Sequence, residues 1–495
     1  MANLSPEQQA VVNWVKNGNG NAFVEAVPGS GKSFLCLHAS YEMKGQVAYL
    51  VFNKKNSDEA KGKMPKHVRV GTFHSFGLST IGRVYPNVFK NINQYKTRDI
   101  LAGMQVEEQL HSFISKLVSM AKNQALGLHG DISDSREWYQ IIDKYDLTSD
   151  LENPEDENLG VEACIGIAKK VLKLSNDMVA ESHVIDYDDM IYYPVVKGMR
   201  MWQYDWVIGD EMQDANKARH AMVRLMMKSN GRGLFVGDRH QAIYGFTGAD
   251  TESVENIIKD FNCKLFPLSV TFRCPKAVVK VCQTVFPHIN AHETAPEGQV
   301  VTIYNNELFT QNFNDTDVII CRKTKPLVET AFALIRKGVP CRVEGKDIGK
   351  GLLNLVNRWK VKSIDVLKDR LKKYLERETS KLIAKGNDVG AQNLQDRIET
   401  IYVLMEGCPD VDCIRDKISK MFKDSATENK KMLTLSTIHK CKGLQWPRVY
   451  VLGYDTHMPL RAKMEWQIKG EQNCMWVAYS RAQETMVLVR GANKS

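Results

Sequence analysis

Residues 26–33 of the chain read Ala26-Val27-Pro28-Gly29-Ser30-Gly31-Lys32-Ser33. One apolar run, residues 22–24, precedes this stretch and another, residues 34–37, follows it, which predicts a strand, a glycine-rich turn and a helix. Such a turn directs backbone N–H groups to the positive end of the helix dipole, where a triphosphate binds. We expect Lys32 to contact the β- and γ-phosphates and the Ser33 hydroxyl to ligate Mg²⁺. The phosphate cradle is expected to consist of Pro28, Gly29, Ser30 and Gly31. The alternative is a Gly/Ser-rich turn before an ordinary helix, because Ala26 stands where the general pattern has its first glycine.

The composition is that of an ordinary soluble globular protein. The 495 residues are enough for roughly three or four domains, and 43% of them are hydrophobic. The net charge of +9 suits a protein that contacts phosphate backbones, although many enzymes reach it without doing so. Eleven cysteines stand singly with no CxxC pair, which argues against a disulfide framework or a zinc site. The N-terminus has neither a basic start nor an apolar signal core, and no 18-residue apolar run occurs, so we expect a cytoplasmic protein without a membrane segment.

Short apolar strands recur in two clusters, one before about residue 270 and one after about residue 300. Near-continuous apolar strands between helical segments are typical of parallel sheets covered on both faces. The sequence therefore predicts two α/β domains. The strands are expected at residues 47–52, 68–70, 206–208 and 234–236 in the first cluster and at 318–321, 449–452 and 486–489 in the second.

A helical stretch interrupts each cluster. Between residues 86 and 185 the apolar residues recur at helical spacing, for example at 110, 113, 114, 117 and 120. A second helical stretch spans residues 346–431 and carries a basic run between Lys360 and Lys373. We interpret this run as a solvated helix face; the alternative is a contact with the backbone of a duplex.

An acidic pair follows the apolar strand at residues 206–208. In P-loop enzymes the strand beside the P-loop ends in an aspartate that holds Mg²⁺ through a water, and Asp210 fits this position. Glu211 is then placed to accept a proton from the attacking water. The alternative is an ordinary acidic loop after a strand, which the order of the two elements along the chain disfavours.

Polar and then aromatic residues follow the strand at residues 234–236. Gln241 is expected to sense the γ-phosphate through a hydrogen bond and to report it along the loop. Tyr244 and Phe246 can offer ring faces to unstacked bases, a contact worth roughly 1–3 kcal/mol per base. The alternative for these aromatics, Tyr244 above all, is a place in the core.

These stretches, taken in order, resemble the UvrD/Rep-type helicases of superfamily 1. Residues 210–214 are similar to the family's DExQD element, and residues 237–249 to its GDxxQxIYxFRGA element. Further elements match at residues 4–8, 52–54, 71–75, 186–190, 271–273, 435–446 and 476–482, so the resemblance covers nearly the whole chain. The FNK and TFHS elements look closest to F-box-type and phage-type members.

The resemblance implies two RecA-like parallel-sheet domains, each with a mainly helical insertion, and ATP in the cleft between them. The first domain would comprise residues 1–85 and 186–268, with its insertion at 86–185. The second would comprise residues 269–345 and 432–495, with a short insertion at 346–431. Two arginines of this second domain, Arg273 and Arg481, are candidates for the ATP site, and the alternative role for either one alone is a surface salt bridge.

The resemblance also assigns roles to single residues. Arg273 and Arg481 would reach the γ-phosphate like arginine fingers supplied in cis. Gln8 would read the adenine edge, Phe272 would stack on its face, and Gln445, which replaces the family's glutamate, would lie near the nucleotide sugar. The contacts to DNA would come from Phe52, Asn53, Thr72, Phe73, His74, Thr437 and His439. Thr247 replaces an arginine of the family pattern, which removes one expected contact to the strand.

The function that follows is an ATP- and Mg²⁺-dependent DNA helicase that moves 3′ to 5′ on single-stranded DNA, with the polarity implied by the resemblance alone. Its partners would be single-stranded DNA and single-strand/duplex junctions, and we expect a monomer; no protein partner is indicated. Two alternatives are a translocase that strips proteins from DNA with little unwinding, and a nucleotide-switched binding or loading module.

Overall fold

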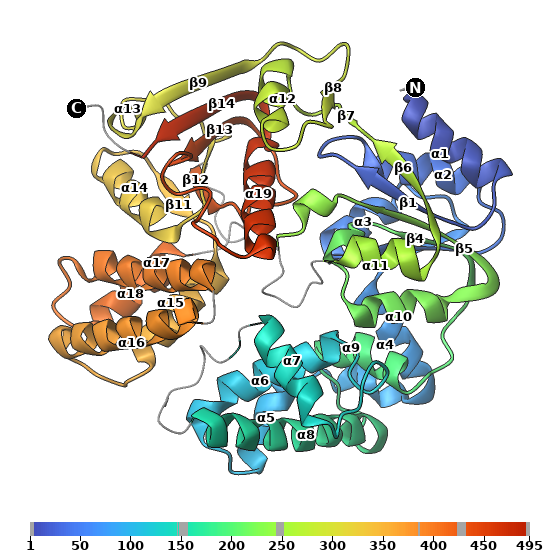
Figure 1. Cartoon of the computed structure of the whole chain (residues 1–495), viewed down its shortest axis with the longest axis horizontal. Helices are drawn as coiled ribbons and strands as arrows, with labels where there is room; N and C mark the ends of the chain where they lie inside the picture. The colour runs from blue at the N-terminus through green and yellow to red at the C-terminus, as the bar shows by residue number, and fades with distance from the viewer. Residues whose placement is uncertain are drawn as a thin grey trace. The chain divides into compact units, whose positions relative to one another are not determined.

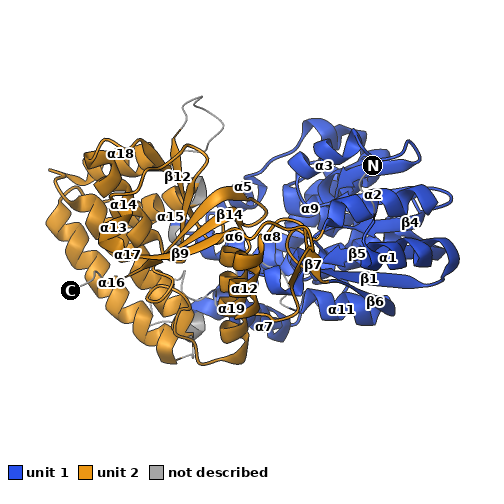
Figure 2. Cartoon of the chain, turned by 90° about the horizontal axis from the view of Figure 1, so that it is seen from above, with its two compact units in different colours: residues 1–26, 31–268 blue, residues 27–30, 269–495 orange. Residues whose placement is uncertain are grey.

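The strand that precedes the glycine-rich turn, β1 (Asn21–Ala26), lies inside a six-stranded sheet of the computed structural model (Figure 1). The structure describes residues 4–145, 147, 157–243, 252–384, 387–422 and 432–491. The chain divides into two units, residues 1–26 with 31–268 and residues 27–30 with 269–495 (Figure 2). Among the described residues no helix is apolar over a long enough stretch to cross a bilayer.

All strand pairs of the first sheet are parallel, and the order is β3-β2-β4-β5-β1-β6. The expectation that the acidic strand lies directly beside the P-loop strand is wrong, because β5 lies between β4 and β1. The remaining strands are β2 (Val47–Val51), β3 (Val68–Thr72), β4 (Tyr204–Gly209), β5 (Met227–Gly237) and β6 (Cys263–Leu268).

Helices cover both faces of this sheet, as near-continuous apolar strands require. In β2, Tyr49 packs with the face covered by α1 (Pro6–Asn17) and α2 (Lys32–Glu42), whereas Leu50 packs with the opposite face. That opposite face is covered by α4 (Phe73–Val84), α9 (Tyr187–Val196), α10 (Lys217–Met226) and α11 (Ser253–Asp260). A short helix, α3 (Lys54–Lys61), joins β2 to β3.

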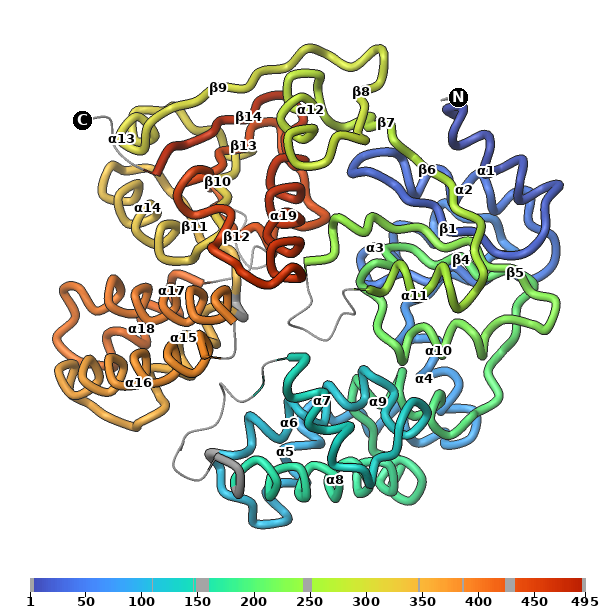
Figure 3. Tube along the Cα trace, viewed as in Figure 1, coloured from blue at the N-terminus to red at the C-terminus, as the bar shows by residue number. Residues whose placement is uncertain are grey.

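A helical bundle is inserted between α4 and α9 (Figure 3). It has an apolar core of its own. It consists of α5 (Lys96–Gly103), α6 (Glu108–Asn123), α7 (Ser135–Tyr145) and α8 (Glu157–Glu181). Two buried ammonium groups tie it to the first turn of α9, because the carboxylate of Asp189 lies 2.7 Å from Lys96 Nζ and 2.8 Å from Lys122 Nζ. Burial alone would raise the pKa of Asp189, but Lys122 and Lys96 outweigh burial and hold that pKa below its ordinary value.

The second unit contains another parallel sheet, in the order β11-β12-β10-β13-β14-β9, which confirms the predicted α/β class with a parallel sheet in each half. Its strands are β9 (Gln299–Tyr304), β10 (Val318–Cys321), β11 (Cys341–Val343), β12 (Leu433–Thr437), β13 (Trp446–Leu452) and β14 (Ala482–Arg490). A two-stranded ladder of β7 (Val270–Thr271) and β8 (Asn290–Ala291) precedes it. The accompanying helices are α12 (Lys276–Gln283), α13 (Asn305–Leu308), α14 (Thr324–Arg336) and α19 (Glu465–Tyr479).

The helices between β11 and β12 share one continuous apolar core with this sheet. They are α15 (Lys346–Asn357), α16 (Ile364–Ala384), α17 (Asp388–Met405) and α18 (Val411–Met421). Asp396 of α17 also accepts hydrogen bonds from the first backbone N–H groups of α14, at Thr324 (2.7 Å) and Lys325 (3.0 Å). The cations of the basic run, from Lys360 to Lys373, are exposed, as a solvated helix face requires.

Candidate nucleotide and nucleic-acid sites

The glycine-rich loop leaves the backbone N–H groups at the start of α2 accessible to an anion. Gly29 (φ +74°) and Gly31 (φ +81°) both adopt the left-handed conformation that favours glycine. Gly31 is the N-cap of α2 and supplies no side-chain cap, and the first turn of the helix carries no acidic residue. The N–H groups at the start of an eleven-residue helix are therefore available to phosphate oxygens, as a triphosphate requires.

Lys32 stands at the start of α2 with its ammonium 2.8 Å from the carboxylate of Glu211. Burial alone would lower the pKa of Lys32, but the nearby carboxylates of Glu211, Asp210 and Asp238 outweigh burial and raise that pKa. Lys32 therefore stays charged, which is the state that binds phosphate. The sequence predicted both residues for the site, and the structure brings them together.

Asp210 is the first residue after β4, and its carboxylate is held by neighbours on both sides. The Tyr49 hydroxyl donates to Oδ2 at 2.9 Å, and the Glu211 backbone N–H donates to Oδ1 at 2.9 Å. Burial and then the charge of Glu211 raise the pKa of Asp210 to about 6. Sequence reasoning missed Tyr49, because a tyrosine within an apolar strand carries no signal that separates it from core residues.

The donor set at this edge of the sheet fits Mg²⁺, which prefers carboxylate and hydroxyl oxygens and retains several waters. The Asp210 carboxylate supplies one such group, and the exposed Ser33 hydroxyl in the first turn of α2 supplies another. These two residues would hold the ion. When bound, Mg²⁺ would supply positive charge that neutralises the phosphates.

A chain of hydrogen bonds runs from Glu211 to Gln241 through a residue to which the sequence analysis gave no role. The Gln213 amide donates to Glu211 Oε2 at 2.6 Å and accepts from the Asp238 backbone N–H at 3.1 Å. Asp238 in turn accepts from the Gln241 amide at 2.8 Å. Gln213 is fully buried, so its two bonds fix the carboxylate of Glu211 relative to the end of β5. The signal was present in the sequence, since Gln213 lies within the quoted acidic element.

Gln8 lies beside the phosphate cradle. Its side chain closes a capping box at the start of α1, where Oε1 accepts from the Ser5 backbone N–H at 3.0 Å. Its Nε2 atom faces Gly31, at which a Cβ would approach it to 2.8 Å. The capping bond orients the amide of Gln8 and leaves its donor end directed at the turn.

Both candidate arginines of the second unit converge on Ser480. Arg273 donates to the Ser480 backbone oxygen at 3.3 Å, and Arg481 donates to the Ser480 hydroxyl at 2.8 Å. Arg481 is fully buried, and its other partners are the backbone oxygens of Val477 and Leu444. Within the described residues Arg481 forms no ion pair with a carboxylate, which disagrees with the surface salt bridge considered as its alternative role.

The turn residue Gly29 belongs to the second unit by its contacts. Its backbone oxygen accepts from the Phe272 backbone N–H at 2.9 Å, and a Cβ at Gly29 would approach Arg273 Cβ to 2.4 Å. The ring of Phe272 is 48% exposed and lies 4.8 Å from the His292 ring. An exposed ring is available for stacking, as the adenine-binding role requires.

The predicted strand-contact loops of the first unit follow β2 and β3. Phe52 is half-buried, and its ring lies 4.8 Å below the guanidinium of Arg219. Phe73 is only 1% exposed and belongs to the core, so its ring cannot face a base; packed against Phe52, it positions that ring instead. Asn53 and Thr72 use their side chains to cap α3 and α4.

His74 is neutral at physiological pH. Burial, and then the charge of Arg219, lower its pKa to about 4. His74 can therefore offer a hydrogen bond to a strand but not a charge. His439 in the second unit is likewise neutral, because burial and then Arg322 lower its pKa well below the ordinary value.

The remaining predicted residues have different surroundings. Thr437 is buried at the end of β12, whereas Gln445 is exposed just before β13. Tyr244, Phe246 and Thr247 lie outside the described residues.

Comparison with known proteins agrees with this arrangement. Residues 4–262 match the family model described as the UvrD/REP helicase N-terminal domain, and residues 387–491 match the UvrD-like helicase C-terminal domain. The chain is 24% identical over 316 residues to "ATP-dependent DNA helicase Rep" of Escherichia coli, an alignment that covers 58% of this chain and 44% of the relative. It is 23% identical over 382 residues to "DNA helicase II" of Haemophilus influenzae, with 66% and 49% covered.

A relative from a vertebrate also matches, in line with the likeness to F-box-type members. The chain is 25% identical over 288 residues to "F-box DNA helicase 1" of Gallus gallus, which covers 57% of this chain and 27% of the relative. The matched region thus spans less than half the length of each of these three relatives. Because the N-terminal model alone covers more than half of the 495 residues, the chain belongs to the UvrD/Rep helicase family.

Proposed function

We propose that this protein is an ATP-dependent DNA helicase that moves 3′ to 5′ along single-stranded DNA. The observation that carries the proposal is the hydrogen-bonded chain from Lys32 through Glu211 and Gln213 to Gln241. It links the residue that holds phosphate, the residue placed to accept a proton from water, and the residue placed to sense the γ-phosphate. The three relatives are named as DNA helicases, which supports DNA as the polymer; the direction rests on the family resemblance.

Hydrolysis in this proposal uses groups from both units. Lys32 and the turn bind the triphosphate, Glu211 takes the proton of the attacking water, and Arg273 and Arg481 stabilise the charge that develops on the γ-phosphoryl group. Arginines in that role are worth about 10³–10⁵ in rate. Because the bound triphosphate favours the arrangement in which every group reaches it, loss of the terminal phosphate would shift the equilibrium and move the strand.

The proposed protein has two ATPase domains, each with an inserted helical segment. The first ATPase domain would comprise residues 1–85 and 186–268 with an insertion at 86–185, and the second residues 269–345 and 432–495 with an insertion at 346–431. The separate apolar core of α5–α8 supports the first insertion as a distinct subdomain. We further propose a monomer that acts in the cytoplasm on single strands and single-strand/duplex junctions.

The deciding experiment compares ATPase rates with single-stranded DNA, duplex DNA and RNA. We expect single-stranded DNA to stimulate turnover most, and Lys32→Ala to abolish it with every polymer. Partial duplexes with a 3′ or a 5′ single-stranded tail then test direction, and only the 3′-tailed duplex should be unwound. An ATPase rate that does not rise when single-stranded DNA is added would overturn the proposal in favour of a nucleotide-switched binding module.

A second arm separates unwinding from protein stripping. The substrate is a biotinylated oligonucleotide with bound streptavidin, and the measurement is the rate of streptavidin release. Release without unwinding of the 3′-tailed duplex would favour the translocase that strips proteins from DNA.

A further inference from the structure

One arginine of the first unit lies beside the predicted strand-contact loops, and the mechanism proposed above gives it no role. Arg219 is the third residue of α10, and its guanidinium carbon lies 4.8 Å from the centre of the Phe52 ring and 5.9 Å from that of the Phe73 ring. Phe52 directly follows β2, and Phe73 directly follows β3. The charge of Arg219 therefore lies at the carboxyl edge of the sheet, next to both loops.

The fold fixes the start of α10 and with it the backbone of Arg219. Asn216 is the N-cap of the helix, and its side-chain oxygen accepts from the Arg219 backbone N–H at 3.0 Å. The Asn216 amide donates to the side chain of Asn123, the last residue of α6, at 2.7 Å. Because Asn216 is only 1% exposed, these bonds are shielded from water and hold the first turn of α10 against the inserted bundle.

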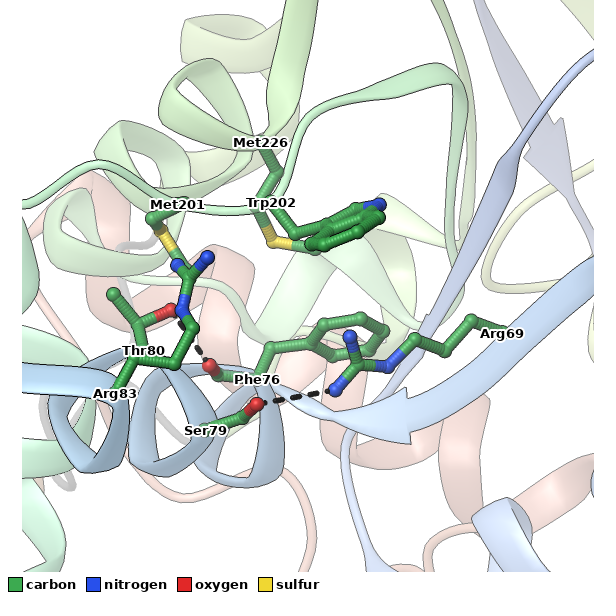
Figure 4. A pocket seen from close by; sticks show the side chains of 8 residues that line it. All are labelled: Arg69, Phe76, Ser79, Thr80, Arg83, Met201, Trp202 and Met226. Carbon is green, nitrogen blue, oxygen red and sulfur yellow. Dashed lines mark hydrogen bonds between the residues drawn. The ribbon is translucent and has the colours of Figure 1, made fainter. Parts of the chain in front are cut away.

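Two further arginines in the described part of the first unit lie over phenylalanine rings, and both donate hydrogen bonds within the protein. Arg69 lies 5.0 Å from the centre of the Phe76 ring, and Figure 4 shows its guanidinium beside that ring with a bond to the Ser79 hydroxyl. Arg224 lies over a ring at the other end of α10 and donates to the Asp260 backbone oxygen at 2.9 Å. Each of these two guanidinium groups thus has a structural partner besides its ring.

Arg219 differs from both. Its side chain is half-buried, and among the described residues its guanidinium donates no hydrogen bond and forms no ion pair. Burial lowers the pKa of Arg219 to about 10, although the nearby carboxylates of Asp188 and Asp214 favour its charge. Arg219 is therefore charged at neutral pH, and its N–H donors are open to an acceptor from outside the fold.

A guanidinium in these surroundings suits the backbone of a single strand. Its planar fork of N–H donors can bind one phosphate through two parallel hydrogen bonds. Proteins that bind single strands combine such cations with aromatic rings, because each nucleotide carries both a phosphate and a base. We propose that Arg219 is a further strand contact, whose guanidinium binds a backbone phosphate of single-stranded DNA beside the Phe52 ring. This inference rests on the proposed function, which places the strand at these loops.

The alternative is a positioning role, in which Arg219 holds the Phe52 ring and contacts no phosphate. The two roles differ in the part of the strand on which they depend. A phosphate contact needs only the backbone, whereas a positioning role acts through the base that stacks on Phe52. A strand of abasic sites keeps the phosphates and lacks the bases, so it separates the two roles.

The test measures binding of the full chain to two fluorescein-labelled single strands by fluorescence anisotropy. One strand is oligothymidine, and its twin has the same number of phosphates with an abasic sugar at every position. We expect Arg219→Gln to weaken binding of both strands about tenfold or more, the loss of one charge-assisted contact. Phe52→Ala should weaken binding of oligothymidine and change binding of the abasic strand little.

A salt series gives a second measurement, which a positioning role would leave unchanged. Each phosphate contact on a single strand contributes about 0.7 to the slope of log affinity against log salt concentration. Arg219→Gln should therefore reduce that slope by about 0.7, and Arg219→Lys, which keeps the charge, should retain most of it. If Arg219→Gln does not fold, Arg219→Met replaces it, since a thioether packs well against aromatic rings.

The matched control is Arg224→Gln, which removes the same charge from the same helix at a guanidinium that already has a backbone partner. It should bind both strands like the wild type and with the same salt dependence. Circular dichroism melting should show that all variants are folded.

Three outcomes would overturn the inference and leave the proposed function in place. The first is wild-type affinity of Arg219→Gln for both strands. The second is weaker binding of oligothymidine alone, which would make Arg219 a positioning residue. The third is an equal loss in Arg224→Gln, which would reduce the effect to net charge. A wild-type chain that binds neither strand would instead overturn the proposed function, and this result is recognised before any variant is made.

Discussion

Replacing Gln213 by leucine tests the hydrogen-bonded chain on which the proposed mechanism depends. The change removes the 2.6 Å bond to the Glu211 carboxylate and the 3.1 Å bond from the Asp238 backbone N–H at a fully buried position. A hydrogen bond to a charged group contributes about 1.5–3 kcal/mol. If that free energy holds Glu211 in its reactive orientation, kcat should fall by about 10- to 150-fold, because 1.36 kcal/mol corresponds to tenfold.

The assay is steady-state ATP hydrolysis with saturating single-stranded DNA, together with the Kd of a fluorescent ATP analogue. The analogue should bind nearly as well as to the wild type, because Lys32 and the glycine-rich turn are untouched. Gln124→Leu is the matched control, since Gln124 is also a buried glutamine and its amide bonds Tyr145 in the inserted bundle. A kcat for Gln213→Leu equal to that of the control would refute the reasoning.

Other changes probe single steps. Lys32→Ala should abolish hydrolysis, because the phosphates lose their counter-charge; turnover that persists in a phosphate-release assay would mean that the turn does not bind ATP. Arg481→Lys keeps the charge but loses the planar fork, and kcat should fall by about 10³-fold in single-turnover hydrolysis; an unchanged kcat in a folded variant would make this arginine purely structural. Phe52→Ala should weaken single-stranded DNA binding by about 1–3 kcal/mol in an anisotropy titration, and unchanged affinity would place its ring outside the strand path. Asp189→Asn leaves two buried ammonium groups without their shared carboxylate and should lower the free energy of unfolding by about 3–5 kcal/mol in urea. The fold lowers the pKa of Asp189, so the contribution of its carboxylate to the free energy of unfolding is present above the unfolded pKa near 4 and is lost as the pH falls through the lower pKa of the folded state. If Asp189→Asn lost stability at acid pH as steeply as the wild type, this carboxylate would not be the cause.

The grouping of Lys32, Asp210 and Glu211 could be predicted because the sequence signals of these residues are local. A glycine-rich turn needs its glycines in sequence, and an acidic pair at the end of an apolar strand is visible without a fold. The position of β5 between β4 and β1 could not be predicted, since strand order is set by how helices pack across the sheet and not by any one strand. The bridging role of Gln213 depends on that order, because Asp238 follows β5.

Residues that look equivalent in the sequence differ in how far their side chains are buried in the structure. Phe52 and Phe73 both follow strands in elements that resemble strand-contact loops, yet only Phe52 keeps an accessible ring. Lysines are mostly exposed in proteins, but Lys96 and Lys122 are each buried with a carboxylate that lies far away in the sequence. Such pairs depend on tertiary contacts, and hydrophobic periodicity gives no information about these contacts.

The sequence predicts both inserted segments as helical, but they are attached differently. The bundle of α5–α8 has its own core, whereas α15–α18 complete the core of the second sheet, and Asp396 anchors the start of α14. The second segment therefore cannot be excised as a module: a truncated chain without it would expose the side of α14 that packs against α17 and should aggregate. For the same reason, a force applied to α16 would be transmitted to the strands through α17 and α14. We therefore expect these helices to move with the sheet as one rigid body.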